Sequence, residues 1–514
     1  MRTPLHGIRA VVAMVCLSPS PSDAHSFGAT YILPIPLWMY VFACSATLIL
    51  AFLVMALSEN APSGPQHARI LKVNVRGLTY KVCRWVVSIL RGGALACTLL
   101  TILAGFIGAA DAANNIGMTL FWVLFLLVLV YLTALLGDVY SLVNPWKWAI
   151  SGLQRLGFDL ETGRLSYPDS LAYWPAFAAY VVLVWLELFG SQKPVVLSIA
   201  LVVYSVITVA GVGLFGSKTW FEKADAFSVL FSLVALLAPL RYRRSGDPPC
   251  CEVELRPPLA CIPNAPTGHI SLVLFVLFIL ASTAYDSVHE TVLWTALFWS
   301  NALKLLAPLW GADLAKAQET LIGWYLVYRQ VGLLIFPFLY LSAYILVILW
   351  VKAWAKAPGG LGDLALKFCF SLIPIGLAYN AAHYFTFVLM QCRALPALIS
   401  DPFGLGWNLL QNKHNIAQLV LPMGLVWHTQ VALILLGHVA SAYWVHRTAM
   451  RELPKGRAVI AGQVPLLVLT ILYTAVSLQI LSLPTGYRVQ LHQPQRIAII
   501  TDLPYAGIDT VRVK

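Results

Sequence analysis

Three histidines and one aspartate stand out because their side chains are of the kinds that bind metals or move protons. His25 precedes the first long apolar run, His383 and His428 lie within later apolar runs, and Asp286 closes another. Ionisable residues within apolar segments are costly and usually mark a pathway, a pair or a site. Imidazole nitrogens and a carboxylate together suit zinc, copper or iron. We therefore expect a divalent metal, copper or zinc, held by the histidines, with Asp286 as a fourth ligand or as the catalytic base.

Processing would add another ligand at His25. The first 24 residues contain two arginines, a short apolar core, and small residues at Ser22 and Ala24, the positions that signal peptidase reads. We predict that residues 1–24 are a signal peptide, so that the new α-amino group lies beside the imidazole of His25. An uncleaved N-terminal segment is the alternative, favoured by the acidic Asp23.

The elements that must position these residues are membrane helices. The chain has 514 residues, of which 59% are hydrophobic and 11% charged, whereas soluble proteins have about half and about a quarter. We predict an all-α polytopic membrane protein with about 10–12 transmembrane helices, in which residues 25–482 form one bundle. Runs of about 20 apolar residues predict spans at 36–57, 86–109, 117–137, 172–190, 194–215, 269–286, 329–354, 366–391, 418–445 and 459–482. Segments 224–240 and 291–310 are shorter or interrupted.

The distribution of lysine and arginine predicts the orientation. The net charge of +12 comes from short basic clusters between apolar runs, a pattern typical of membrane orientation rather than of nucleic-acid binding. We expect the mature N-terminus and the tail 483–514 outside the cell and the basic clusters in the cytoplasm. Those clusters lie at 69–84, 241–244, 352–356 and 446–457. To keep them on one side, segment 224–240 must enter and leave the bilayer on the same side.

Depth along the predicted helices favours His383 and His428 over His438. At about 1.5 Å per residue, His383 lies about 12 Å inside the outer end of its span, and His428 lies about 15 Å below the outer end of its own. His438 is about 15 Å further along the same helix as His428, too far to share one ion. One outward-facing pocket therefore collects His25, His383, His428 and Asp286 in this hypothesis.

A structural role is the alternative for each of these histidines, because polar side chains also join helices across a bilayer. Tyr379 and Thr386 lie about one turn on either side of His383 and extend a polar stripe. Glu187 is a further intramembrane carboxyl, without an obvious partner in its own span. Asp138 is predicted mainly to cap the helix that follows it.

Several stretches resemble a bacterial family of integral membrane proteins described as fenitrothion hydrolases. The similar pieces are AHSFGATYILPIPLWMY, GDVYSLVNPWKW, YNAAHYFTFVLMQ, ISDPFGLGWNLL and VALILLGHVASAYWVH. They are spread over most of the chain. The resemblance implies a membrane-bound organophosphorus hydrolase that cleaves the phosphorus–O-aryl bond of apolar triesters. It assigns no catalytic residues to this chain.

Three classes of function are compatible with these patterns: a hydrolase, a protein that handles or transports metal, and a structural subunit of a larger membrane assembly. In a hydrolase, the metal would acidify water and polarise the phosphoryl group, and the small apolar organophosphate would reach the site from the lipid. In the alternative, the chain is a membrane metal (copper) handling protein or a transporter. A signal peptide without a nearby lipobox cysteine favours the bacterial inner membrane.

Overall fold

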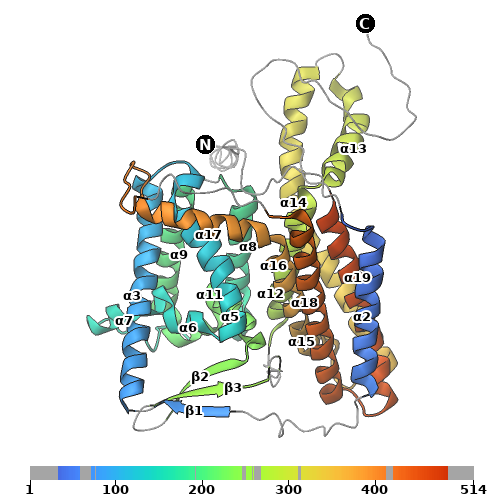
Figure 1. The fold of residues 1–514 in the computed structure, drawn as a ribbon, viewed down its shortest axis with the longest axis horizontal. Helices are drawn as coiled ribbons and strands as arrows, with labels where there is room; N and C mark the ends of the chain where they lie inside the picture. The colour runs from blue at the N-terminus through green and yellow to red at the C-terminus, as the bar shows by residue number, and fades with distance from the viewer. Residues whose placement is uncertain are drawn as a thin grey trace, which may run out of the picture.

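The protein is a bundle of long helices in the computed structural model (Figure 1). The structure describes residues 33–57, 71–75, 77–191, 193–245, 250–257, 259, 268–310, 314–411 and 421–483. The predicted signal peptide, His25 and nearly all of the predicted tail lie outside these residues. Ten described helices are long and apolar enough to cross a membrane, at the ten predicted places. The predicted class, an all-α polytopic membrane protein, is confirmed.

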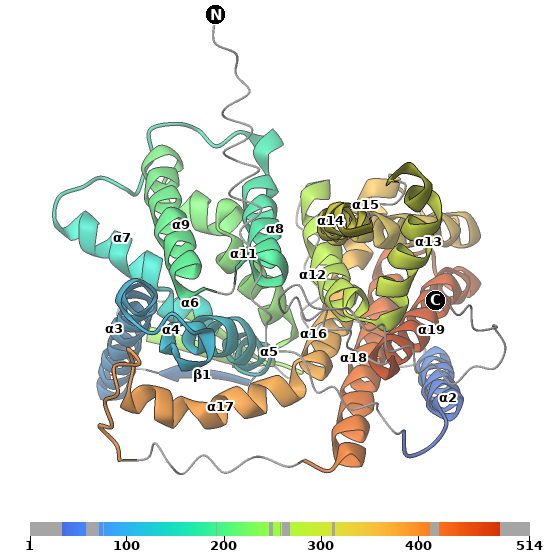
Figure 2. The ribbon, with the colours of Figure 1, turned by 90° about the horizontal axis from the view of Figure 1, so that it is seen from above.

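The helices form two groups when the bundle is seen from above (Figure 2). Simple spans are α2 (Leu37–Leu57), α3 (Gly77–Ile107), α8 (Trp174–Phe189), α9 (Pro194–Phe215), α12 (Ile270–His289), α14 (Leu314–Ala355), α18 (Met423–Glu452) and α19 (Arg457–Ser482). One composite span joins α4 (Ile116–Met118), the π-helical η3 (Thr119–Val128) and α5 (Leu129–Leu136). The other joins α15 (Leu361–Cys369), η7 (Phe370–Leu372) and α16 (Ile373–His383). α3, α5, α8 and α9 form one group, and α16 lies between it and the rest.

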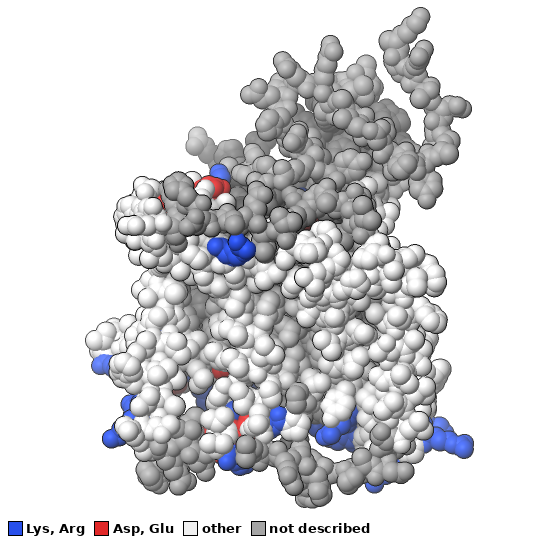
Figure 3. All heavy atoms as spheres, in the orientation of Figure 1, with Lys and Arg blue, Asp and Glu red and all other residues white. Residues whose placement is uncertain are grey.

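A small sheet closes one end of the bundle. Its strands are β1 (Leu71–Val75), β2 (Leu240–Ser245) and β3 (Cys250–Leu255), antiparallel and in the order β1-β3-β2. Lys72 Nζ lies 2.9 Å from Glu252 Oε1, and this hydrogen bond raises the pKa of Lys72. Lysine and arginine side chains gather at this end of the molecule (Figure 3). The basic clusters therefore share one end, as the orientation argument requires.

The segment around 224–240 leaves and returns at the same end of the bundle, as its predicted re-entrant topology requires. α9 runs antiparallel to α3, since Ser198 near its start donates to Thr101 O near the end of α3, so α9 ends at the sheet end. The chain then forms α10 (Ser217–Thr219), η5 (Trp220–Ala224), α11 (Ala226–Val234) and η6 (Ala235–Leu237) before it returns to β2. Asp225 caps α11, because its Oδ2 accepts from Ser228 N at 2.8 Å. This buried carboxyl has a structural role.

Shorter helices complete the bundle. They are η2 (Ala112–Asn114), α6 (Val139–Val143), α7 (Pro145–Arg155), η4 (Asp169–Leu171) and α13 (Val292–Trp310). Asp138 caps α6, where its Oδ1 accepts from Ser141 N at 2.9 Å, so the predicted capping role is confirmed. α13 stands with the first part of α14 beyond the rest of the bundle (Figure 1).

One predicted span differs from the structure. The apolar run 366–391 is not a single helix, because α16 ends at His383 and α17 (Phe385–Ser400) continues in another direction, across the end of the first helix group (Figures 1 and 2). Tyr384 lies at the break with φ −88° and ψ 7°. Most residues on both sides are apolar, apart from the polar stripe that contains His383, so hydropathy gives no sign of the turn. His383 therefore lies at the end of its span and not about 12 Å inside it.

Close packing of α3 on α9 depends on Gly105. A Cβ added there would lie 1.9 Å from Ser198 Oγ and 2.5 Å from Pro194 O, whereas one added at Gly93 of the same helix would meet nothing within 4 Å. We expect Gly105→Ala to lower the free energy of unfolding by about 1–3 kcal/mol, and Gly93→Ala to leave it unchanged or raised. Thermal unfolding in detergent measures both variants. Equal midpoints would contradict the packing described here.

Candidate active site

The centre of the candidate site is a pair formed by a half-buried histidine and a buried aspartate. Asp286 lies in the last turn of α12, and His383 is the last residue of α16. His383 Nε2 is 2.9 Å from Asp286 Oδ2. Asp286 is 3% exposed, while the His383 side chain keeps 16% of its surface exposed. The structure thus brings together two of the four residues that the sequence singles out.

The next residue of α12, Ser287, binds the other nitrogen of the same imidazole. Ser287 Oγ lies 2.9 Å from His383 Nδ1. Ser287 Oγ also lies 3.3 Å from Thr283 O, but the imidazole nitrogen is nearer, so the serine hydrogen is assigned to that contact and the ring hydrogen to Nε2. His383 Nδ1 then accepts from the Ser287 hydroxyl. Serine, histidine and aspartate are therefore connected in one series, in which the aspartate fixes the tautomer and orientation of the ring.

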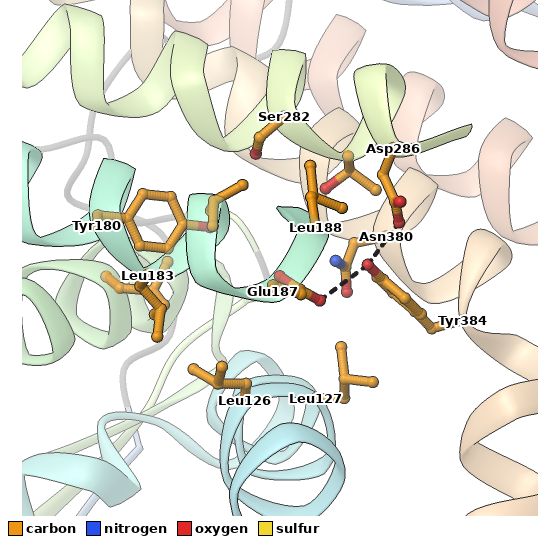
Figure 4. A pocket seen from close by; sticks show the side chains of 13 residues that line it. Leu126, Leu127, Tyr180, Leu183, Glu187, Leu188, Ser282, Asp286, Asn380 and Tyr384 are labelled. Carbon is orange, nitrogen blue, oxygen red and sulfur yellow. Dashed lines mark hydrogen bonds between the residues drawn. The ribbon is translucent and has the colours of Figure 1, made fainter. Parts of the chain in front are cut away.

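Tyr384 connects this pair to a second carboxyl, which is half-buried. Its hydroxyl lies 2.7 Å from Asp286 Oδ2 and 3.1 Å from Oε1 of Glu187 on α8 (Figure 4). Tyr384 is the residue at the break between α16 and α17. The position of its hydroxyl therefore depends on this break, which hydropathy does not predict. Ser287 and Tyr384 carry no sequence signal that separates them from other polar residues in apolar runs. Glu187 has such a sequence signal, because it is a carboxyl within an apolar run.

A small cavity with both polar and apolar residues on its wall lies beside these groups. Its volume is about 50 Å³, which is enough for water. Figure 4 shows Glu187, Asp286 and Tyr384 on its wall, where Asp286 and Glu187 approach the Tyr384 hydroxyl from opposite sides. The other polar residues of the wall are Tyr180, Ser282, Thr283 and Asn380. Ser287 and His383 are not part of the wall, and they reach the cavity only through the contact of His383 with Asp286.

A much larger groove adjoins this cavity. It has a volume of about 760 Å³ and runs between α8 and α9, with η3 behind it. Its walls are mainly apolar, and its volume is within the usual range for a small-molecule site. The groove and the cavity share Leu127, Leu183, Glu187 and Tyr384. The small cavity and the mainly apolar groove therefore meet at the Glu187 carboxyl and the Tyr384 hydroxyl, which line both spaces.

His428 lies apart from this site. It is exposed on α18, where its Nδ1 donates to Gly424 O at 2.6 Å and its Nε2 lies 3.2 Å from the hydroxyl of Tyr40 on α2. Gln430 donates to Ala382 O at 2.9 Å and so faces α16. A step of two residues, from His428 to Gln430, turns the side chain by about 200° around the helix. Because Gln430 faces α16, His428 faces away from His383.

The predicted metal site is thus only partly represented in the structure. Within the described ranges, no three His, Cys, Asp or Glu side chains are grouped closely enough to hold a metal ion. His25 lies outside these ranges, and both ring nitrogens of His383 are hydrogen-bonded. A copper or zinc ion on His25, His383 and His428 stays a prediction, and it would require His428 to move relative to α16.

Comparisons with protein-family models, with curated proteins and with solved structures find no match for this chain. The geometry of the site, the membrane-spanning architecture and the resemblance of the sequence pieces are therefore the grounds for a functional assignment.

Proposed function

We propose that this chain is a membrane-bound hydrolase that cleaves the phosphorus–O-aryl bond of apolar phosphorothioate triesters such as fenitrothion. The observation that carries the proposal is the junction of a small cavity, lined in part by Asp286 and other polar residues, with an apolar groove at Glu187 and Tyr384. A hydrolase of apolar esters needs both spaces. One holds water beside a base, and the other holds the substrate.

The groove suits the substrate better than an aqueous pocket would. A neutral aryl triester partitions into lipid, and the groove lies between two helices that are long enough to span the bilayer. Apolar walls with a few polar groups at one place are typical of small-molecule sites. In the proposal the aryl ring lies between α8 and α9, and the phosphorus atom lies near Tyr384, next to the cavity.

Asp286 serves as the general base in this mechanism. A water molecule in the cavity gives a proton to the Asp286 carboxylate while its oxygen bonds to phosphorus. The phosphorus–O-aryl bond breaks, its electron pair leaves with the aryl oxygen, and a dialkyl thiophosphate remains. The Nε2 hydrogen of His383 holds the carboxylate in place, and Ser287 fixes the opposite nitrogen. We further propose that the protein lies in a bacterial inner membrane with its mature N-terminus outside.

The first test is turnover by the purified protein in lipid nanodiscs, measured as nitrophenol release from fenitrothion. A matched pair of variants on α9 tests the groove: Ala200 lines it, whereas Val206 is 63% exposed and does not. We expect Ala200→Trp to raise KM about tenfold, because the indole occupies space used by the substrate, and Val206→Trp to leave KM unchanged.

Two outcomes would contradict the proposal. If purified protein with a normal unfolding midpoint releases no nitrophenol, the hydrolase assignment fails. If it turns over fenitrothion but Ala200→Trp and Val206→Trp give the same KM, the substrate does not bind in the groove.

A further inference from the structure

We infer that Glu187 and Asp286 hold one proton between them, and that this proton rests on Glu187. The argument begins with the Tyr384 hydroxyl, which has a single hydrogen but lies within hydrogen-bond distance of both carboxyl groups, at 3.1 Å and 2.7 Å. One of these two contacts must therefore use a hydrogen that belongs to a carboxyl. Two ionised carboxylates cannot both be satisfied by one hydroxyl.

The hydrogen bonds of Asp286 decide where the proton rests. Asp286 Oδ2 also lies 2.9 Å from His383 Nε2, the ring nitrogen to which the hydrogen is assigned. An oxygen that receives a ring N–H and a phenol O–H is best ionised. The Tyr384 hydrogen then points to Asp286, and the remaining contact is a bond from the Glu187 acid to the Tyr384 oxygen. The series runs in one direction from Glu187 through Tyr384 to Asp286.

The surroundings of Glu187 favour the neutral acid. The titratable groups that face it among the described residues are Tyr131, Tyr180, Asp286, His383 and Tyr384. This set contains no lysine or arginine, and His383 contacts Asp286 directly rather than Glu187. Glu187 is half-buried among mainly apolar residues, where a carboxylate without a cation is costly, and a second carboxylate nearby adds to the cost. Glu187 also lines the apolar groove, where a neutral acid costs less than an anion.

This proton gives Glu187 a role in the reaction, an extension that rests on the proposed hydrolase function. Glu187 faces the groove, so it can give its proton to the aryl oxygen as the phosphorus–oxygen bond breaks. Asp286 meanwhile gains a proton from the attacking water. Transfer of that proton through the Tyr384 hydroxyl to Glu187 restores the starting state. The two carboxyls thus act as base and acid, a division typical of paired carboxyls in different environments.

Infrared spectroscopy tests the proton without any use of activity. Protein in detergent at neutral pH should show a C=O stretching band of a protonated carboxylic acid, shifted in D₂O and lost in Glu187→Gln. Glu222→Gln is the matched control, because Glu222 is exposed and its replacement should leave the band. Absence of the band from the wild type, or its persistence in Glu187→Gln, would overturn the inference.

A series of aryl leaving groups tests the acid role. We expect Glu187→Gln to lower turnover about tenfold for a nitrophenyl ester and about a thousandfold for an unsubstituted phenyl ester, because poorer leaving groups need the proton more. A loss that is equal for all leaving groups would overturn the acid role, even if the infrared band is lost. A wild type with the band but without turnover would overturn the hydrolase function and leave the shared proton in place.

Discussion

Replacing Asp286 with asparagine is expected to lower fenitrothion turnover by about a thousandfold, within the range for loss of a general base. Asparagine keeps an oxygen that accepts from His383 Nε2 and the Tyr384 hydroxyl, so the contacts at 2.9 Å and 2.7 Å survive. It cannot take a proton from water. Chemistry is therefore lost while the packing of α12 on α16 is retained.

The measurement is kcat for nitrophenol release, beside the unfolding midpoint of each variant. Asp138→Asn is the matched control, since Asp138 caps α6 away from the site and asparagine caps helices as well as aspartate does. Its turnover should equal that of the wild type. If a folded Asp286→Asn protein retained more than about a tenth of wild-type turnover, Asp286 would not be the base.

The second large effect is expected from His383→Ala, which should lower turnover about a hundredfold. The substitution removes the N–H that holds Asp286 Oδ2 and leaves the Ser287 hydroxyl without the imidazole. His383→Gln should recover part of the loss, because its amide supplies an N–H donor of similar reach. His428→Ala should retain full turnover, because His428 contacts Tyr40 and faces away from His383.

The same variants decide the metal prediction. If His25→Ala, His383→Ala and His428→Ala all lose bound copper or zinc together with turnover, the three histidines are ligands and His428 must reach the site in the active protein. If only His383→Ala loses turnover and the metal content of the three variants is equal, the pair of His383 and Asp286 acts without a metal held by the three histidines. Metal analysis of detergent-purified protein supplies the comparison. Turnover that persists after chelation, with the metal removed, would also contradict a required metal.

The spans were predictable because membrane thickness fixes the length of an apolar run. All ten were located from this rule, although the span predicted at 366–391 ends at His383. Charge balance predicted that segment 224–240 enters and leaves on one side. The sheet was not predicted, since β1 and β3 are separated by more than 170 residues and their pairing has no local signal. The break at Tyr384 was missed because apolar residues continue through it.

The site was less predictable because sequence position gives the depth of a residue along a helix but not its direction around the bundle. His383 and His428 were matched in depth, yet His428 faces α2 while His383 faces α12. The directions of Ser287 and Tyr384 depend on the packing of α12 against α16 and on the helix break. Glu187 was recognised as an unusual carboxyl, but its partner lies 197 residues away.

The sheet at the basic end also limits how the bundle can move. β1 lies on the connection from α2 to α3, and β2 and β3 lie on the connection from α11 to α12. Both connections pass between the two helix groups, and the ladder β1-β3-β2 ties them to each other. Any rocking of one group against the other would therefore be smallest at this end and larger at the opposite end, where α17 crosses and Glu187, Asp286 and Tyr384 lie.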